Sequence, residues 1–167
     1  MRDETIKPES VLEQLSRAVQ TDHTSESQDA TLDRSSRSAE ESERDLERLL
    51  ESVSDALDVE EVVFEDALVK GNLEEFLLVL IAIHEEAHGD QLLTDLERIF
   101  DARLSPGTVY PCLHDLEEEE VLSMHAKVRT KEYSIDDPAV VRETVEETML
   151  QHLSFGLLLH AFLEAYD

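Results

Sequence analysis

Residues 84–88, HEEAH, have the spacing of a catalytic metal site. His84, Glu85 and His88 match H-E-x-x-H, in which two histidines on one helical face bind zinc and the glutamate activates a metal-bound water. Gly89 follows the second histidine directly, so we expect the helix to end before a rigid site can form. The sequence also offers no convincing third ligand downstream. We therefore predict no enzyme, no catalytic residue and no cofactor; metal binding by the histidine pair without catalysis stays open.

A second set of side chains suits DNA, because hydroxyls, imidazoles and cations contact phosphates and base edges when no carboxylate stands beside them. Residues 102–114 contain no acid and one base, and residues 121–131 contain no acid and three bases. Arg129 is favoured for the minor groove or for a bidentate phosphate contact. The predicted DNA-binding residues are Ser105, Thr108, Tyr110, His114, Lys127, Arg129 and Lys131.

The elements that would position these residues are a helix and a hairpin. Ser105 is a plausible N-cap with Pro106 at the first helical position, and Val109, Leu113 and Leu116 recur at helical spacing to face a core, with Tyr110 beside them. Residues 121–135 alternate loosely and predict a two-stranded hairpin, with Tyr133 packing its base. A capped helix followed by a basic hairpin is typical of a winged helix-turn-helix.

These stretches also resemble a known family. SPGTVYPCLHDLEEEE followed by RTKEYSI resembles the recognition helix and wing of PadR-like winged-helix transcriptional regulators. Upstream, LVKGNLEEFLLVLIAI and HGDQLLTDLERIF resemble the first two helical segments of that family, so the resemblance covers Leu68 to Ile135. Asp90 stands where the family usually has an aromatic residue, and Glu120 where a glycine usually ends the recognition helix. The resemblance implies DNA binding and a C-terminal dimerisation helix.

Before the recognition helix, the sequence predicts three further helices. Leu46, Leu49, Leu50, Val53 and Leu57 form one apolar stripe on a helix that begins at Glu43. A connection over 58–68 carries an apolar cluster, Val62 to Phe64, which we expect to pack on the core. Asn72 is predicted to cap a buried helix through Ile83, Gly89 to end that region, and 91–100 to form the next helix.

The chain ends with a predicted helix from Asp137-Pro138 to about Tyr166. A terminal helix this apolar must pack back on its own domain or pair with a second copy, and we favour a two-fold homodimer. The helix from Glu43 is a candidate to complete that interface. We expect a core role for His152 and for His160. The predicted dimer seam is Val141, Val145, Met149, His152, Leu159 and Leu163, together with Gly156.

Composition points to a high-salt environment. The chain has 41 Asp and Glu against 14 Lys and Arg, a net charge of −27, and this acid-rich, lysine-poor pattern is similar to that of haloarchaeal cytoplasmic proteins. The single cysteine, Cys112, allows no intrachain disulfide, and we expect it to fill an alanine-like packing role. The longest apolar run, 76–83, is too short for a membrane span, and the N-terminus lacks the apolar core of a signal peptide. We predict a soluble cytoplasmic protein.

The combined prediction is a mainly α protein with a small β-hairpin wing (α+β), a winged helix-turn-helix with a C-terminal dimerisation helix. Its expected parts are a disordered acidic and Ser-rich extension over 1–42 with a short helix at 8–20, a winged-helix domain with its leading helix over 43–136, and the dimerisation helix over 137–167. The expected function is sequence-specific binding of double-stranded DNA by a homodimer on a pseudo-palindromic operator, with an unknown effector. A winged-helix protein-interaction module and an H-E-x-x-H hydrolase are the alternatives.

Overall fold

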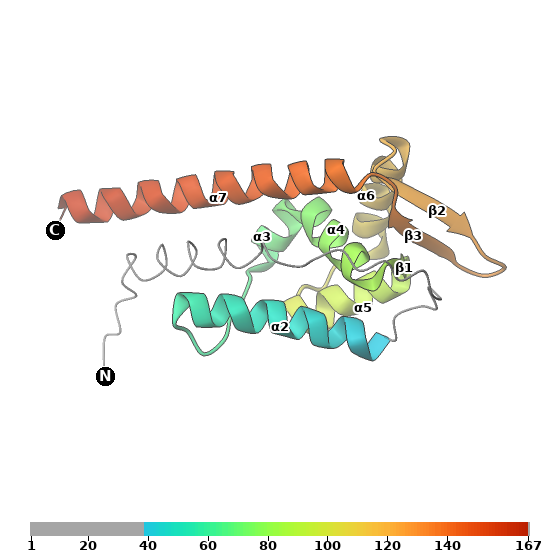
Figure 1. Ribbon diagram of the computed structural model, residues 1–167, viewed down its shortest axis with the longest axis horizontal. Coiled ribbons are helices and arrows are strands. Elements are labelled where there is room, and N and C mark those ends of the chain that lie inside the picture. Colours follow the sequence, from blue (N-terminus) through green and yellow to red (C-terminus); the bar gives the residue numbers. More distant parts are fainter. Residues whose placement is uncertain (1–38, 167) are drawn as a thin grey trace, which may run out of the picture. The chain divides into compact units, whose positions relative to one another are not determined.

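The computed structural model describes residues 39–166, which form a leading helix followed by eight further helices and strands (Figure 1). The chain divides into two compact units, residues 1–62 and 63–167. This division groups the C-terminal helix with the winged-helix elements, whereas the sequence suggested boundaries after 42 and 136. The elements are α2 (Ala39–Leu57), α3 (Asp66–Gly71), α4 (Leu73–His84), β1 (Glu86–His88), α5 (Gly89–Phe100), α6 (Pro106–Glu118), β2 (Leu122–Ala126), β3 (Lys131–Ile135) and α7 (Pro138–Tyr166).

In the first unit, α2 begins at Ala39, four residues before the predicted start. Glu40 and Glu41 lie in its first turn, where negative charge is favourable beside the helix dipole. Arg44 lies one turn on and forms an ion pair with Glu40 at 3.7 Å. Residues 39–42 therefore belong to a helix and not to the predicted disordered extension. The rest of that extension, including the predicted helix at 8–20, lies outside the described residues.

The core of the second unit lies among α4, α5 and α6, which contact one another. Each helix turns its apolar stripe inward, as the spacing predicted. Phe64, Phe76 and Phe100 add an edge-to-face aromatic cluster with ring centroids 4.8–5.9 Å apart. The expected packing of the connection before α3 is thus confirmed for Phe64 and is wrong for Val63, which is 74% exposed. The fully buried side chains include Val69, Leu77, Leu78, Leu80, Ile81, Leu92, Leu96, Val109, Leu113 and Leu116.

A short helix, α3, precedes α4 and changes the expected role of Asn72. The Asn72 side chain donates a hydrogen bond to the Leu68 carbonyl at 2.8 Å, so it satisfies the end of α3. It makes no side-chain capping bond to α4, which begins at Leu73. Asn72 therefore occupies the predicted N-cap position, but the prediction that its side chain caps α4 is wrong, because the sequence showed no sign of a separate turn of helix just before it.

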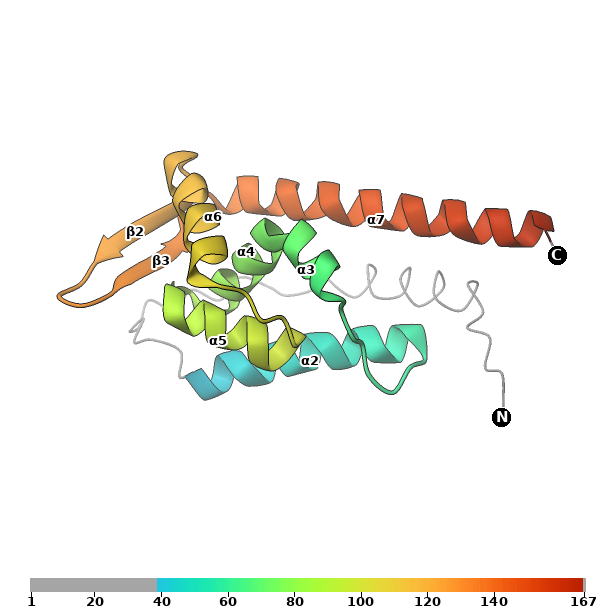
Figure 2. The same ribbon diagram turned by 180° about the vertical axis from the view of Figure 1, so that it is seen from behind.

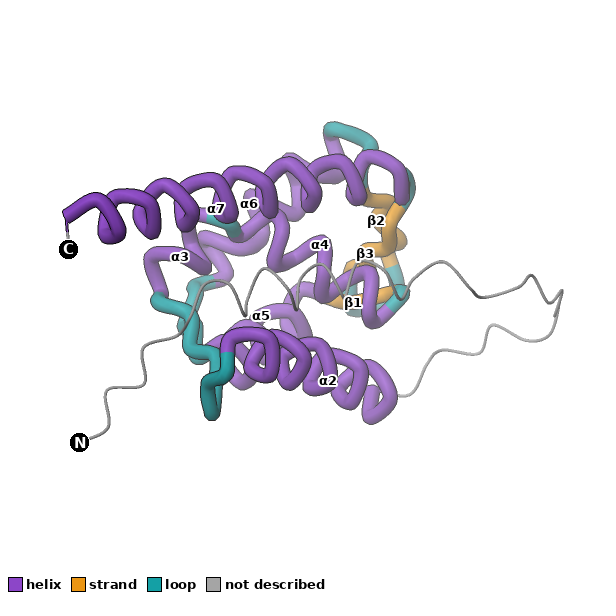
Figure 3. Tube along the Cα trace, turned by 60° about the vertical axis from the view of Figure 1, so that its left-hand side comes forward, coloured by secondary structure: helices purple, strands orange, loops and turns teal. Residues whose placement is uncertain are grey.

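A three-stranded antiparallel sheet replaces the predicted two-stranded hairpin, with strand order β1-β3-β2 (Figure 3). Ala87 of β1 pairs with Tyr133 of β3, which in turn pairs with Met124 of β2. Tyr133 is 3% exposed, so its predicted packing at the wing base is confirmed. The strand β1 has three residues, too few for an alternating pattern to be visible in the sequence.

Helix α7 starts where the sequence predicted. The Asp137 carboxylate accepts hydrogen bonds from the backbone N–H groups of Ala139 at 2.9 Å and Val140 at 3.3 Å, the arrangement of a helix N-cap. The early turns of α7 contact α4, where the Thr148 hydroxyl donates to Glu75 at 2.5 Å. The helix then continues past α3 and α4 (Figure 2). None of the helices over residues 39–166 combines the length and the apolar character that crossing a membrane requires.

Candidate nucleic-acid interface

The first turn of α6 presents a small polar surface to solvent. Ser105 occupies the N-cap position with extended backbone angles, and Pro106 follows as the first helical residue, as predicted. The Ser105 side chain does not cap the helix, because its hydroxyl lies 3.0 Å from that of Thr108 instead. Both residues are exposed, and each hydroxyl keeps further hydrogen-bonding capacity. The two predicted contact residues thus lie together at the end of the helix that a winged-helix protein directs into the major groove.

Tyr110 fastens α6 to α5. Its hydroxyl donates a hydrogen bond to the Asp90 carboxylate at 3.3 Å, and burial, followed by the negative charge of Asp90, raises the pKa of the phenol. Its ring lies directly over Gly89, where a Cβ atom would come within 2.5–2.6 Å of three ring and hydroxyl atoms. Gly89 begins α5, so the prediction that it ends the preceding helical region is wrong. Tyr110 is half-buried, and its hydroxyl is already engaged within the protein.

His114 has acidic neighbours on the exposed face of α6. Its Nδ1 lies 3.8 Å from a carboxylate oxygen of Glu118, and Asp115 is beside them. Two acids of this helix, Asp115 and Glu118, line one shallow groove with Pro106, Gly107, Tyr110, Pro111 and His114. One nitrogen or carboxylate oxygen from each of His114, Asp115 and Glu118 lies within 4.8 Å of the others. These atoms are close enough to share a cation, although exposed acidic groups commonly bind none. The sites best suited to DNA are therefore Ser105 and Thr108.

The wing supplies two unpaired cations instead of three. Lys127 forms an ion pair with Glu132, and the hydrogen bond from Lys127 is the main cause of the lowered pKa of that glutamate. Arg129 and Lys131 are exposed and form no ion pair with any described residue. Arg103, the base just before α6, pairs with Glu97 at 2.9 Å. Positive charge available for phosphate is thus concentrated at Arg129 and Lys131.

The H-E-x-x-H residues do not form a zinc-peptidase site. Helix α4 ends at His84, and Glu85 takes a positive φ of 64°, so the two histidines do not share a helical face. His84 Nε2 lies 2.7 Å from Asp95, and His84 Nδ1 lies 3.2 Å from the Gln91 amide. The ring of His88 accepts the backbone N–H of Gln91 at 3.0 Å and caps α5. Both histidines thus serve the junction between α4 and α5.

Cys112 has the environment of a packing residue, as predicted. Its side chain is half-buried on the inner flank of α6. Burial, together with the nearby carboxylates of Glu74, Asp115 and Glu75, raises the pKa of the thiol to about 11. A thiol of this kind stays protonated near neutral pH and is a poor nucleophile.

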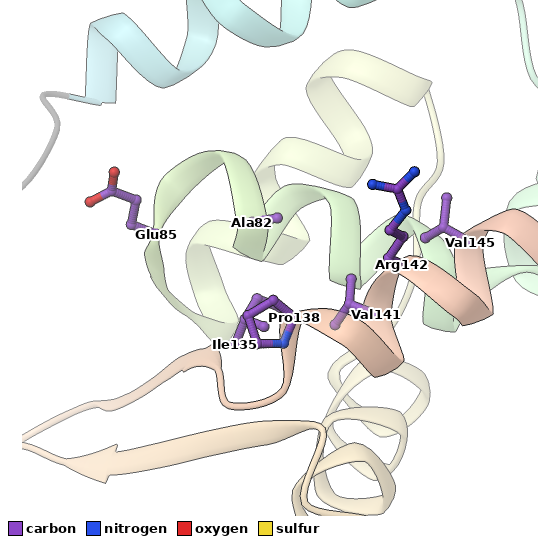
Figure 4. A pocket seen from close by; sticks show the side chains of 7 residues that line it. All are labelled: Ala82, Glu85, Ile135, Pro138, Val141, Arg142 and Val145. Atoms are coloured by element: carbon purple, nitrogen blue, oxygen red, sulfur yellow. The ribbon is translucent and has the colours of Figure 1, made fainter. Parts of the chain in front are cut away.

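The predicted dimer seam divides into two parts. Val141 and Val145 are half-buried and line a groove of about 490 Å³ with Ala82 of α4 and Ile135 of β3 (Figure 4). Glu85, Pro138 and Arg142 complete the lining of this groove. The remaining seam residues, Met149, His152, Leu159 and Leu163, are exposed on the single chain. The ring nitrogen of His152 lies 2.8 Å from the Thr148 carbonyl. The core role of His152 in the dimer seam stays a prediction, because the seam requires a second chain.

Comparison with known proteins agrees with this architecture. Residues 77–138 match the Transcriptional regulator PadR-like family. This segment is a PadR-like domain. It contains the contact between Tyr110 and Gly89, helix α6 and the hairpin of β2 and β3. The match confirms the resemblance drawn from the sequence.

Relatives align with more residues of this chain than the family model does. The chain is 43% identical over 98 residues to the transcriptional activator GvpE of Haloferax mediterranei, and 42% identical over 98 residues to GvpE1 of Halobacterium salinarum. Each alignment covers 59% of this chain and 51% of the relative, so the match spans about half the length of these proteins. Both relatives come from haloarchaea, which agrees with the acid-rich composition.

Two solved structures are also similar to part of this chain. A transcriptional regulator from Clostridium thermocellum has a TM-score of 0.48 and 16% identity, covering 57% of this chain and 95% of that one. A PadR-like transcription factor from Bacteroides fragilis has a TM-score of 0.44 and 21% identity, covering 55% of this chain and 91% of that one.

Proposed function

We propose that this protein is a transcriptional regulator that binds double-stranded DNA sequence-specifically through α6 and the wing. The observation that carries the proposal is the pairing, within a PadR-like domain, of an exposed polar helix start at Ser105 and Thr108 with two unpaired wing cations, Arg129 and Lys131. The hydroxyls would meet base edges or phosphates in the major groove, while the wing cations bind phosphate or the minor groove. The relatives named transcriptional activators favour activation.

The second part of the proposal is a homodimer on a pseudo-palindromic operator in a high-salt cytoplasm. Met149, Leu159 and Leu163 of α7 are 48–63% exposed on the single chain, and a helix this apolar needs a partner. A two-fold pair would direct two α6 helices into successive major grooves about 34 Å apart, one turn of DNA.

The test is fluorescence anisotropy in molar KCl with DNA from the protein's own promoter region. We expect the double change Arg129→Ala and Lys131→Ala to weaken binding on the order of tenfold to a hundredfold, since two phosphate or groove contacts are lost. The matched control, Arg44→Ala with Arg48→Ala, removes the same charge from α2 and should leave binding within about twofold. Equal losses in the two double variants would show that only total charge matters.

A second candidate function is a protein-interaction module that no longer binds DNA. Asp115 and Glu118 on the exposed face of α6 favour this alternative, because phosphate repels carboxylates. A well-folded wild-type dimer that binds no promoter fragment at any salt concentration would support it. The hydrolase alternative loses its structural basis, since His84 and His88 lie on different elements.

A further inference from the structure

The tip of the wing carries an apolar side chain that the fold does not require. The Lys127 N–H donates a hydrogen bond to the Thr130 carbonyl at 2.8 Å, so Val128 and Arg129 are the two central residues of the turn between β2 and β3. Tight hairpin turns favour Gly, Asn or Asp at these positions, and this turn has none of them. Residues that break a local preference in this way are commonly found at functional sites.

The exposure of Val128 distinguishes it from the other apolar residues of the winged helix. Its side chain is fully exposed, and among the described residues from 73 to 137 it is the only large apolar residue in the exposed class. The hairpin that carries it projects beyond the helices of its own unit (Figure 1). Val128 therefore lies at the part of the wing that reaches farthest from the core.

The charges around Val128 suit the phosphate-lined groove of DNA. No acid occurs from residue 121 to residue 131, and Lys127 neutralises Glu132, the nearest acid in the sequence. Arg129, the other central residue of the turn, is exposed and forms no ion pair within the part of the chain that the structure describes. The tip thus combines one free cation with one apolar side chain, as in proteins that insert apolar residues into the minor groove.

We propose that Val128 enters the minor groove of the bound DNA and makes the protein select A·T base pairs there. The inference rests on the proposed function and adds a specificity-determining residue to it. In the minor groove an A·T pair presents only acceptors, whereas a G·C pair adds the 2-amino group of guanine. An isopropyl side chain at the groove floor collides with that amino group and displaces the water to which it donates, with no acceptor to replace it.

An apolar contact also suits the high-salt environment that the composition indicates. At 1 M salt the Debye length is only about 3 Å, so the attraction between Arg129 and phosphate is strongly screened. The contact between Val128 and the groove floor depends on shape and on desolvation, and salt does not screen it. Val128 therefore preserves selectivity under conditions in which charge alone discriminates poorly.

The test varies the minor groove at the wing and leaves the major groove unchanged. Hydroxyl-radical footprinting of the full chain on its promoter DNA first locates the base pairs that face the wing. Three duplexes then carry A·T, G·C or inosine·C pairs at those positions. Inosine lacks the 2-amino group, so an inosine·C pair has the minor-groove pattern of A·T and the major-groove pattern of G·C. We expect the wild type to bind the A·T and inosine duplexes equally, and the G·C duplex on the order of tenfold more weakly.

A single substitution tests whether Val128 causes this selection. Val128→Thr keeps the branched shape and adds a hydroxyl that accepts a hydrogen bond from the guanine amino group, so we expect it to bind all three duplexes within about threefold. The matched control, Val63→Thr, makes the same change at an exposed valine outside the wing and is expected to keep the full discrimination. Circular dichroism verifies that both variants keep the helix content of the wild type.

The outcomes separate this inference from the proposed function. A wild type that binds the three duplexes equally would overturn the role of Val128 and leave DNA binding intact. Rejection of the inosine and G·C duplexes alike would place the selection in the major groove and would also overturn it, as would a Val128→Thr variant that still rejects G·C. A wild type that binds no duplex would overturn both proposals, and the exposed valine would then indicate a protein partner.

Discussion

At the scale of single residues, the contact between Gly89 and Tyr110 sets how α5 meets α6. The Tyr110 ring occupies the space that a side chain at Gly89 would need. The Tyr110 hydroxyl donates a hydrogen bond to Asp90, the residue that follows Gly89. The aspartate that replaces the usual aromatic residue of the PadR-like family thus has a role, since it accepts the bond that keeps the ring in place. The position of Ser105 and Thr108 depends on this contact, because they lie at the start of the same helix.

We expect Gly89→Ala to lower the free energy of unfolding by about 1–2 kcal/mol, because the added methyl group overpacks against Tyr110. Gly107→Ala is the matched control, since its new Cβ would meet only the Ser105 hydroxyl at an ordinary 3.6 Å. That change is expected to be neutral or stabilising by less than about 1 kcal/mol, as alanine favours helix. Urea unfolding measures both, and the loss at Gly89 is expected to vanish in a Tyr110→Ala background. Equal effects at the two glycines would refute the steric account.

The contacts that residue-level reasoning missed involve partners outside the segment in which each residue was considered. Lys127 was predicted to be free because no acid lies within 121–131, yet hairpin pairing brings Glu132 beside it. His84 was considered as a ligand, but its partner Asp95 lies eleven residues later on the buried face of another helix. The Lys127 pair follows from the hairpin register and the His84 pair from helix packing. The one sequence signal for the His84 pair was a carboxylate, Asp95, on the apolar face of 91–100.

At the scale of elements, the end of α6 carries a conformational cost. Glu120 has a φ of 60°, in the left-handed region where the family usually has glycine. The Val121 N–H donates a hydrogen bond to the Leu116 carbonyl at 3.0 Å and closes the turn. The backbone thus keeps the left-handed conformation at Glu120, although a residue with a side chain is unfavourable there. The sequence showed Glu120 where the family usually has glycine, and the structure gives this residue a left-handed backbone conformation that glycine adopts without a steric penalty.

Replacement of Glu120 tests the free-energy cost of its positive φ. We expect Glu120→Gly to raise the free energy of unfolding by about 0.5–1 kcal/mol, because glycine adopts a positive φ without the steric penalty of a side chain. Glu119→Gly removes the same charge one residue earlier, where φ is −81°, and is expected to be destabilising. Thermal unfolding in molar KCl compares them with wild type. A stabilisation shared by both changes would instead indicate relief of charge repulsion among Glu117 to Glu120.

The longer elements were predictable and the shortest were not. Periodic apolar residues and the caps at Ser105 and Asp137 predicted helices α4 to α7 and the hairpin. The short pieces α3 and β1 have six and three residues, which is less than two periods of helix or strand. Their existence depends on packing against α4 and β3, which no local pattern encodes.

At the scale of the whole molecule, charge distinguishes this protein from an ordinary basic repressor. Counterion release from phosphates by Arg129 and Lys131 would weaken binding as salt rises. Cation uptake between DNA and the carboxylates of Asp115 and Glu118 would oppose that loss. The balance between these two effects should set how binding responds to salt.

We expect DNA binding to persist into multi-molar KCl, with affinity constant or rising. Anisotropy titrations from sub-molar to multi-molar KCl measure this dependence. The double change Asp115→Asn and Glu118→Gln removes the groups that take up cations, so its affinity is expected to fall more steeply with salt than that of wild type. A steep loss for the wild type itself would contradict the expectation.

The link between the wing and α7 is short and firmly held. Two residues separate β3 from α7, and both are bonded: the Asp136 carboxylate accepts the Ser123 hydroxyl at 2.6 Å, and Asp137 caps the helix. We therefore expect the wing and the first turn of α7 to move together. In a paired molecule, a few degrees of rotation between the two α7 helices would be delivered to both wing tips as a change in their separation. A signal that acts on the C-terminal helices could thus retune the grip on DNA mechanically, from a distance.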